Sequence, residues 1–268
     1  MSSAPDLNAD PWLVTLGRER PDAHTHLYCF PHAGAGASAF LGWALPQRED
    51  VQLNAVVLPG RESRLRHRAL GNLDAVVEHA TTSILHANAG NIALLGHSFG
   101  ALLAYLVAER LDERGRHTSA LIVSGARAPH LPRPDAAIHD APDDVFVDVL
   151  TRRYGGIPDA VLADAEMMEL FLPPLRADFR MLETFDWRRA TPLDVPVLAL
   201  SGTRDRAASP ADVAHWADLA LNTFEHHQLD GDHFFIRSAR DQLLALVDAA
   251  LRRVPPHRRD STCCSTIS

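Results

Sequence analysis

The sequence predicts an α/β protein with a mostly parallel central sheet covered by helices on both faces. Short strand-like runs alternate with helical patterns along the chain, which is typical of doubly wound sheets. Several of these runs, such as NAVVL, IALL and VLAL, are apolar at successive positions, as expected for strands buried on both faces. One long stretch contains no strand pattern and predicts a helical insertion.

Each predicted strand is a short apolar run bounded by polar or turn residues. The six predicted strands are residues 26–30, 53–58, 92–95, 120–124, 195–201 and 223–229. The four predicted helices outside the insertion are residues 73–87, 99–114, 209–220 and 242–254. Gly115 is suited to follow the second helix, and Ser209-Pro210 is suited to open the third. Leu243, Val247 and Leu251 form an apolar stripe along the fourth.

The predicted insertion covers about residues 127–190. It opens with several prolines and then shows three helical patterns, centred near residues 149, 165 and 179. Such an insertion normally lies over the carboxyl ends of the strands, where ligands bind, so we expect a helical lid. We expect one domain over residues 1–254 and a disordered tail over residues 255–268, which are polar.

Composition excludes several functions. The net charge of −8 disfavours nucleic-acid binding, and all 26 basic residues are arginine, so no lysine is available for a P-loop or a Schiff base. No apolar run reaches the roughly 18 residues of a membrane helix, and the first residues do not resemble a signal peptide, so we expect a cytoplasmic protein. The three cysteines fit neither a disulfide framework nor a metal motif. We therefore expect no metal and no cofactor.

Ser98 is the predicted nucleophile. It lies in LLGHSFG, between a strand and a helix, which is the context that a G-x-S-x-G nucleophile turn requires. The flanking glycines leave room for a tight turn, and the N–H of Phe99 would face an oxyanion from the start of the helix.

An acid and a base follow Ser98 in the order expected for this kind of sheet. Asp205 comes directly after the strand VPVLALS, and His233 lies in the loop LDGDHFFI after the last strand. Asp186 and Asp194 precede their strand and lie at the wrong edge. His97 is beside Ser98 but points away from it, and we expect it to pack in the core. We expect structural roles for His226 and His227, which lie inside a strand pattern. His32 comes before the serine, which is the wrong order for the base.

The glycine-rich loop YCFPHAGAGASAF predicts the second oxyanion donor, the backbone N–H of Ala33 or of a neighbour. An alternative remains open, because Gly34-Ala-Gly36-Ala-Ser-Ala39 also matches a dinucleotide-binding fingerprint. That fingerprint expects an acidic residue after the next strand, where this chain has Arg61, and it leaves the serine, acid and histidine unexplained.

The chain resembles the type II thioesterases of polyketide and nonribosomal peptide assembly, which have the α/β-hydrolase fold. The resemblance covers about residues 26–250, and the matching segments are CFPHAGAGAS, LPGRE, LLGHSFGALLAY, LPPLRADFRMLETF, LSGTRDR and GDHFFI. It implies a catalytic triad of Ser98, Asp205 and His233, with oxyanion donors at Phe99 and Ala33. Gly202-Thr203 and Ala207-Ala208 depart from the usual acid motif without removing the acid.

The resemblance implies hydrolysis of stalled acyl groups from the phosphopantetheine arm of acyl or peptidyl carrier proteins. We expect the protein to be a monomer. A general carboxylesterase, a product-releasing thioesterase and a binding protein without activity remain as alternatives, because the triad itself does not distinguish thioesters from oxygen esters. Apolar lid residues are expected to offer surface to the acyl chain: Met167, Met168, Phe171, Leu172, Phe179 and Met181. Two groups of basic residues are candidates for carrier docking: Arg61, Arg64, Arg66 and Arg68, or Arg127 and Arg133.

Overall fold

The computed structural model describes residues 11–255, apart from residues 88, 89, 134, 156 and 158. The strands are β1 (Leu13–Thr15), β2 (Thr25–Phe30), β3 (Val51–Val56), β4 (Asn91–His97), β5 (Thr118–Ser124), β6 (Val197–Gly202) and β7 (Phe224–Leu229). The α-helices are α1 (Leu73–Ala87), α2 (Phe99–Glu113), α3 (Asp143–Tyr154), α4 (Asp159–Leu162), α5 (Ala165–Thr184), α6 (Pro210–Ala214), α7 (Phe235–Ser238) and α8 (Arg240–Leu251). Short 3₁₀ helices are η1 (Ala37–Phe40), η2 (Glu62–Arg64), η3 (Trp187–Arg189) and η4 (His215–Leu219). The tail expected to be disordered lies outside the described residues, except for Pro255.

The strands form one seven-stranded sheet in the order β1-β3-β2-β4-β5-β6-β7. Every neighbouring pair is parallel except β1 with β3, which confirms the mostly parallel sheet. The register aligns the carboxyl ends of β4 and β5, where His97 is opposite Ser124. Loops that leave the strands at this edge therefore meet in space. The sequence analysis missed β1, because three residues are too short to show a pattern.

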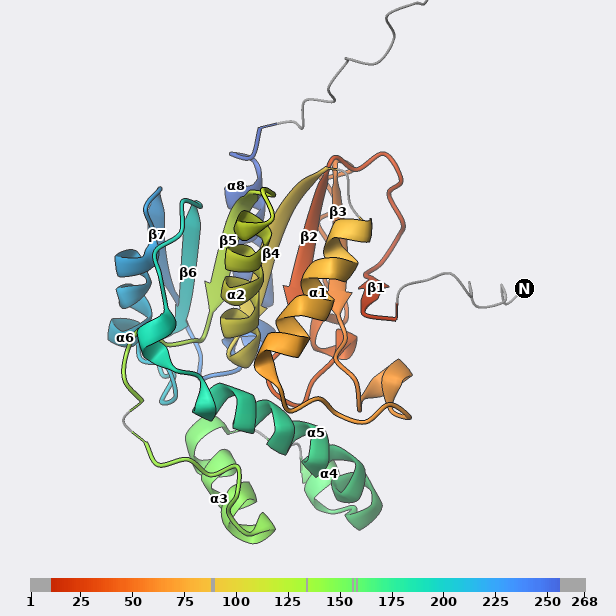
Figure 1. Ribbon diagram of the computed structural model, residues 1–268, viewed down its shortest axis with the longest axis vertical. Coiled ribbons are helices and arrows are strands. Elements are labelled where there is room, and N and C mark those ends of the chain that lie inside the picture. The colour runs from red at the N-terminus through yellow and green to blue at the C-terminus, as the bar shows by residue number, and fades with distance from the viewer. Residues whose placement is uncertain (1–10, 88–89, 134, 156, 158, 256–268) are drawn as a thin grey trace, which may run out of the picture.

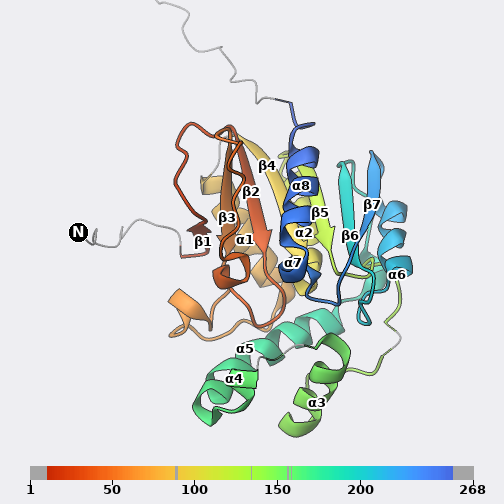
Figure 2. The same ribbon diagram turned by 180° about the vertical axis from the view of Figure 1, so that it is seen from behind.

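Helices cover both faces of the sheet (Figures 1 and 2). Helices α1, α2 and α6 pack on one face, where Ile84, Leu103 and Val213 belong to one buried cluster. Helix α8 packs on the other face through Leu243 and Val247, which belong to a second cluster. The strands are buried between these two cores, which explains their apolar residues at successive positions. In the described part of the chain, no helix combines the length and the apolar character needed to cross a membrane.

Helices α3, α4 and α5 form the helical insertion, which lies across the carboxyl edge of the sheet (Figure 1). It has a core of its own that includes Phe146, Leu150 and Phe179. The second predicted pattern is divided between two helices, because Val161 and Leu162 lie in α4 whereas Ala165 begins α5. Helix α5 then runs through Pro173 and Pro174 and includes the third pattern.

Candidate active site

Ser98 occupies a strained turn between β4 and α2. Its φ and ψ angles are 56° and −119°, a region that residues with a side chain rarely adopt. The backbone N–H of Ser98 donates to the carbonyl oxygen of Ser124 at 2.8 Å, which ties the turn to the end of β5. The turn holds Oγ at the carboxyl edge of the sheet.

The glycines on either side of the turn are required by close backbone contacts. A Cβ atom added at Gly96 would lie 2.0 Å from the carbonyl oxygen of Gly100. A Cβ atom added at Gly100 would lie 2.1 Å from the carbonyl oxygen of Phe30, at the end of β2. The spacing of this motif is therefore a packing requirement of the junction between strand and helix.

The structure brings Ser98, His233 and Asp205 into one hydrogen-bonded chain. His233 Nε2 lies 2.9 Å from Ser98 Oγ, and His233 Nδ1 lies 2.8 Å from Asp205 Oδ2. Because an ionised carboxylate only accepts, Nδ1 carries the proton and Nε2 is free to accept from the serine hydroxyl. This is the geometry of a nucleophile, a base and an orienting acid.

Asp205 is fixed in place by its own loop. Its second carboxylate oxygen, Oδ1, accepts from the backbone N–H groups of Ala207 at 2.8 Å and Ala208 at 3.0 Å. The side chains of Asp205 and His233 are both buried. The two alanines that depart from the family's acid motif thus supply the backbone donors for the acid.

The competing histidines lie elsewhere or have other partners. His97 is fully buried and its Nδ1 lies 3.0 Å from Ser124 Oγ, while burial lowers its pKa well below the usual value. Burial lowers the pKa of His32 to about 4, so this imidazole is neutral at ordinary pH. His226 lies in β7 and its Nε2 is 2.9 Å from Ser201 Oγ. His227, in the same strand, pairs with Glu225.

The loop that contains Ala33 is held by a buried ion pair that the sequence analysis missed. Asp178 on α5 accepts from the backbone N–H of Gly34 at 2.8 Å, and its two carboxylate oxygens also accept from the Arg61 guanidinium. Arg61 also donates to the carbonyl oxygen of Ala35 at 3.2 Å. Arg61 and Asp178 both lie in segments that carry the family resemblance, which was the only signal for them.

This part of the structure disfavours the dinucleotide-binding alternative. The backbone N–H groups of Ala37 and Ser38 donate to the carboxylate of Glu62, at 2.8 and 3.0 Å. A Cβ atom at Gly36 would lie 2.5 Å from the same carboxylate. A side chain of the protein therefore takes the position that a phosphate would need, and only the four-residue helix η1 follows.

Two cavities meet at Ser98 and His233. The first, of about 80 Å³, runs past Ala126, Leu182 and Trp216. Its charged lining residues are Arg127, Arg133, Arg153 and Asp135, and Arg153 pairs with Asp135 at 3.1 Å. The second, of about 50 Å³, runs under the helical insertion and has mainly apolar walls, made by Ala33, Leu150, Ile157, Phe171, Leu175, Phe179 and Phe234. Tyr154 lines both cavities.

The apolar residues named for the lid fall into three groups. Phe171 and Phe179 line the second cavity, and Met168 and Leu172 pack beside them on the core of the insertion. The expectation was wrong for Met181, which is buried in the main core. The side chain of Met167 is exposed to solvent and lines neither cavity.

Only some of the arginines in the expected docking loop, residues 61–68, are exposed for contact with a carrier protein. Arg61 and Arg64 are buried, so they are not docking residues. Arg64 donates to the carbonyl oxygen of Val57 and lies over the ring of Trp12. Arg66 and Arg68 are exposed, and Arg127 and Arg133 line the first cavity.

The chain is similar to known thioesterases in sequence and in fold. The family model of the thioesterase domain matches residues 25–251. The gramicidin S biosynthesis protein GrsT of Aneurinibacillus migulanus is 33% identical and covers 87% of this chain and 91% of its own length. The RedJ thioesterase of the prodiginine pathway in Streptomyces coelicolor has a TM-score of 0.78 at 39% identity, over 88% of this chain and 90% of RedJ. YbtT, a type II thioesterase of the yersiniabactin NRPS/PKS pathway, has a TM-score of 0.77 at 29% identity, over 91% of this chain and all (100%) of YbtT.

Proposed function

The chain belongs to the thioesterase domain family, and from this premise we propose that it is a type II thioesterase of polyketide or nonribosomal peptide assembly. It hydrolyses acyl thioesters on the phosphopantetheine arms of acyl or peptidyl carrier proteins. The observation that carries the proposal is the hydrogen-bonded chain of Ser98, His233 and Asp205 at the meeting point of two cavities. GrsT, RedJ and YbtT, named for biosynthesis or for type II thioesterase activity, support the pathway class.

Acylation begins at Ser98. His233 Nε2 removes the hydroxyl proton as Oγ attacks the thioester carbonyl, and Asp205 stabilises the imidazolium that forms. The backbone N–H groups of Phe99 and Ala33 are the proposed donors to the tetrahedral oxyanion. Phe99 is suited because it is the first residue of α2, where helix N–H groups have no partner within the helix. Ala33 lines the second cavity together with Ser98.

The acyl-enzyme then breaks down by hydrolysis. A thiol with a pKa of about 8.5 leaves readily as a thiolate, so the first step makes little demand on a general acid. The His233 imidazolium passes its proton to the departing thiolate and so becomes a base again. His233 Nε2 then removes a proton from a water molecule, which attacks the acyl carbonyl, and it returns that proton to Ser98 Oγ as the carboxylic acid leaves. These steps use the three side chains, the two backbone donors and one water molecule, so the proposed mechanism includes neither a metal nor a cofactor.

The two cavities suggest where the two halves of the substrate bind. The acyl group fits the mainly apolar cavity under the helical insertion, which acts as a lid. The phosphopantetheine arm, which carries a phosphate, fits the first cavity, whose lining has three arginines and one carboxylate, Asp135. Arg127 and Arg153 already pair with Asp212 and Asp135, so Arg133 is the arginine we propose for the phosphate. Because the whole chain has a net charge of −8, an acidic carrier must be attracted by a local basic surface such as this one. We place the enzyme in the cytoplasm, working as a monomer.

The proposal is tested by hydrolysis of a panel of acyl-carrier-protein thioesters, with release of the free carrier thiol as the readout. The wild-type protein should release thiol, and Ser98→Ala should not. A p-nitrophenyl ester of the same acyl chain serves as the comparison substrate. A higher kcat/KM on the aryl ester than on every carrier thioester would identify a general carboxylesterase, and activity retained in Ser98→Ala would refute the site.

A further inference from the structure

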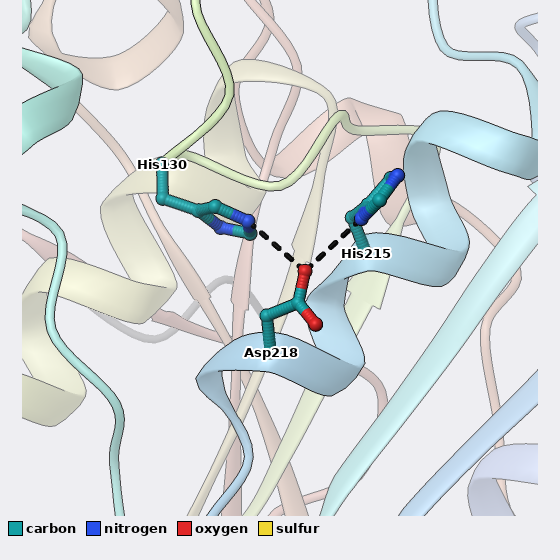
Figure 3. A group of neighbouring side chains, drawn as sticks. All are labelled: His130, His215 and Asp218. Atoms are coloured by element: carbon teal, nitrogen blue, oxygen red, sulfur yellow. Dashed lines mark hydrogen bonds and ion pairs between the residues drawn. The ribbon is translucent and has the colours of Figure 1, made fainter.

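Two histidine side chains outside the active site converge on one carboxylate oxygen, that of Asp218 (Figure 3). His130 lies in the segment between β5 and α3, whereas His215 and Asp218 lie one turn apart on η4. Asp218 Oδ2 is 3.2 Å from His130 Nε2 and 3.0 Å from His215 Nδ1. Within the described residues, this is a group whose ligand atoms all lie within 4.8 Å of one another.

We propose that His130, His215 and Asp218 bind a divalent transition-metal ion, with Zn²⁺ as the best match. Two imidazole nitrogens and one carboxylate oxygen are a donor set that Zn²⁺ prefers, and three protein ligands leave a fourth position for water. Ligands about 2.1 Å from one ion lie roughly 3.0–3.4 Å apart at coordination angles of about 90–109°. The two separations that involve Asp218, 3.2 and 3.0 Å, already fall in this range. The two imidazole nitrogens lie within 4.8 Å of each other and would have to move closer together around an ion.

The ion would reach the site from solvent, because the side chains of His215 and Asp218 are 54% and 57% exposed. In each imidazole the nitrogen that now faces Asp218 would bind the ion, and a metal-bound nitrogen must be unprotonated. The cysteine pattern predicted no metal, and these ligands escape a sequence motif because His130 is 88 positions from Asp218.

The site lies next to the first cavity. Pro129 and Leu131, the neighbours of His130, line that cavity, and so does Trp216, the neighbour of His215. The Trp216 Nε1–H already donates to the carbonyl oxygen of Ala126 at 2.9 Å, which links the same two segments. A bound ion would therefore join the start of the helical insertion to η4 and hold two walls of the cavity together.

Isothermal titration of the untagged, chelator-treated protein with Zn²⁺ tests the proposal. We expect uptake of one ion per chain in the wild type and loss of that uptake in His215→Ala and in the isosteric Asp218→Asn. His117→Ala is the matched control, because His117 pairs with Asp112 at 2.9 Å on the surface and belongs to no group of three ligands among the residues that the structure describes. No uptake by the wild type, or the same uptake in His215→Ala as in His117→Ala, would overturn the site.

Thermal unfolding gives an independent readout. An ion that binds only the folded state raises Tm, so Zn²⁺ should raise Tm in the wild type and in His117→Ala but not in His130→Ala or Asp218→Asn. If a variant folds poorly, the d–d absorption of bound Co²⁺ in the remaining variants reports the ligand set directly. Equal Zn²⁺-dependent shifts in the wild type and Asp218→Asn would count against the proposal.

Discussion

Asp178 and Arg61 form a buried, bidentate ion pair between α5 and the loop after β3. The distances are 2.6 Å from Nη1 to Oδ2 and 2.9 Å from Nη2 to Oδ1. The same carboxylate receives the backbone N–H of Gly34, so one residue of the helical insertion holds the loop of the proposed oxyanion donor Ala33. Asp178 is therefore a positioning residue as well as a structural one.

Asp178→Ala should lower both stability and activity. It leaves the Arg61 guanidinium buried without its partner, which should cost about 3–5 kcal/mol of unfolding free energy. It also frees the Gly34 N–H, so kcat/KM should fall. Urea denaturation and thioester hydrolysis measure the two effects. Asp148→Ala, which removes an exposed i,i+4 pair with Arg152, should cost about 0.5 kcal/mol or less. Equal losses in the two variants would contradict the role of the buried pair.

Ser98→Gly should be more stable than Ser98→Ala, although glycine normally destabilises a fold. The φ angle of 56° at this position strains any residue with a Cβ atom, and relief of that strain is worth about 1 kcal/mol or more. Both variants should lose activity by about 10⁴-fold or more, because the nucleophile is gone. Denaturation curves of Ser98→Gly and Ser98→Ala compare their free energies of unfolding. A glycine variant less stable than the alanine variant would show that the turn is not strained.

Gly100→Ala should disrupt the junction between β4 and α2. The added methyl group would overlap the carbonyl oxygen of Phe30, at 2.1 Å, and backbone cannot move away as a flexible side chain can. We expect a loss of about 3 kcal/mol or more and very low activity. Gly71→Ala is the control, since its Cβ atom would approach only Arg180, at 4.0 Å. Calorimetric Tm values near wild type for both variants would refute this packing argument.

Stability should fall as the pH is lowered from about 6.5 to 4, in part because of His32. Burial lowers the pKa of His32 from 6.5 to about 4, so in this range the unfolded chain binds a proton that the folded chain does not. The unfolding free energy attributable to His32 should drop by about 2 kcal/mol at pH 5. His32→Gln should flatten this part of the profile, whereas His117→Gln, with a side chain that is 82% exposed, should keep it. The measurement is urea denaturation at pH 7 and pH 5.

Arg133→Glu should lower kcat/KM for carrier-bound substrates but not for small thioesters. If the phosphopantetheine arm uses the cavity lined by Arg133, a reversed charge there should raise KM and lower kcat/KM for acyl-carrier protein by about tenfold. Hydrolysis of a small aryl thioester, which has no phosphate, should change little. Arg66→Glu alters an exposed arginine away from both cavities and is the matched comparison. A larger loss of kcat/KM in Arg66→Glu than in Arg133→Glu would indicate that the carrier protein docks on the loop of residues 61–68 instead.

Local structure could be predicted where a short run of residues is compatible with only one backbone arrangement. The run LLGHSFG predicted a strand, a tight turn and a helix, and β4, Ser98 and α2 follow in that order. The chain order of serine, acid and histidine at strand ends predicted which side chains would meet, because parallel strands bring their carboxyl ends to one edge. The element boundaries were less predictable: α5 continues through Pro173-Pro174, where local propensity indicates a break.

The sequence by itself determined the fold class, the identity of the three residues proposed to be catalytic and the family. Only the tertiary structure decided which charged residues are buried and which distant groups are neighbours. From the sequence alone, Arg61 looks like a surface charge, but in the structure it pairs with Asp178, 117 positions away. Likewise His130 looks like an ordinary loop residue, but in the structure it lies beside Asp218 of η4. The physical reason is that the environment of a polar side chain depends on contacts between residues far apart in the sequence. Strand, turn and helix patterns depend instead on residues that are close in the sequence.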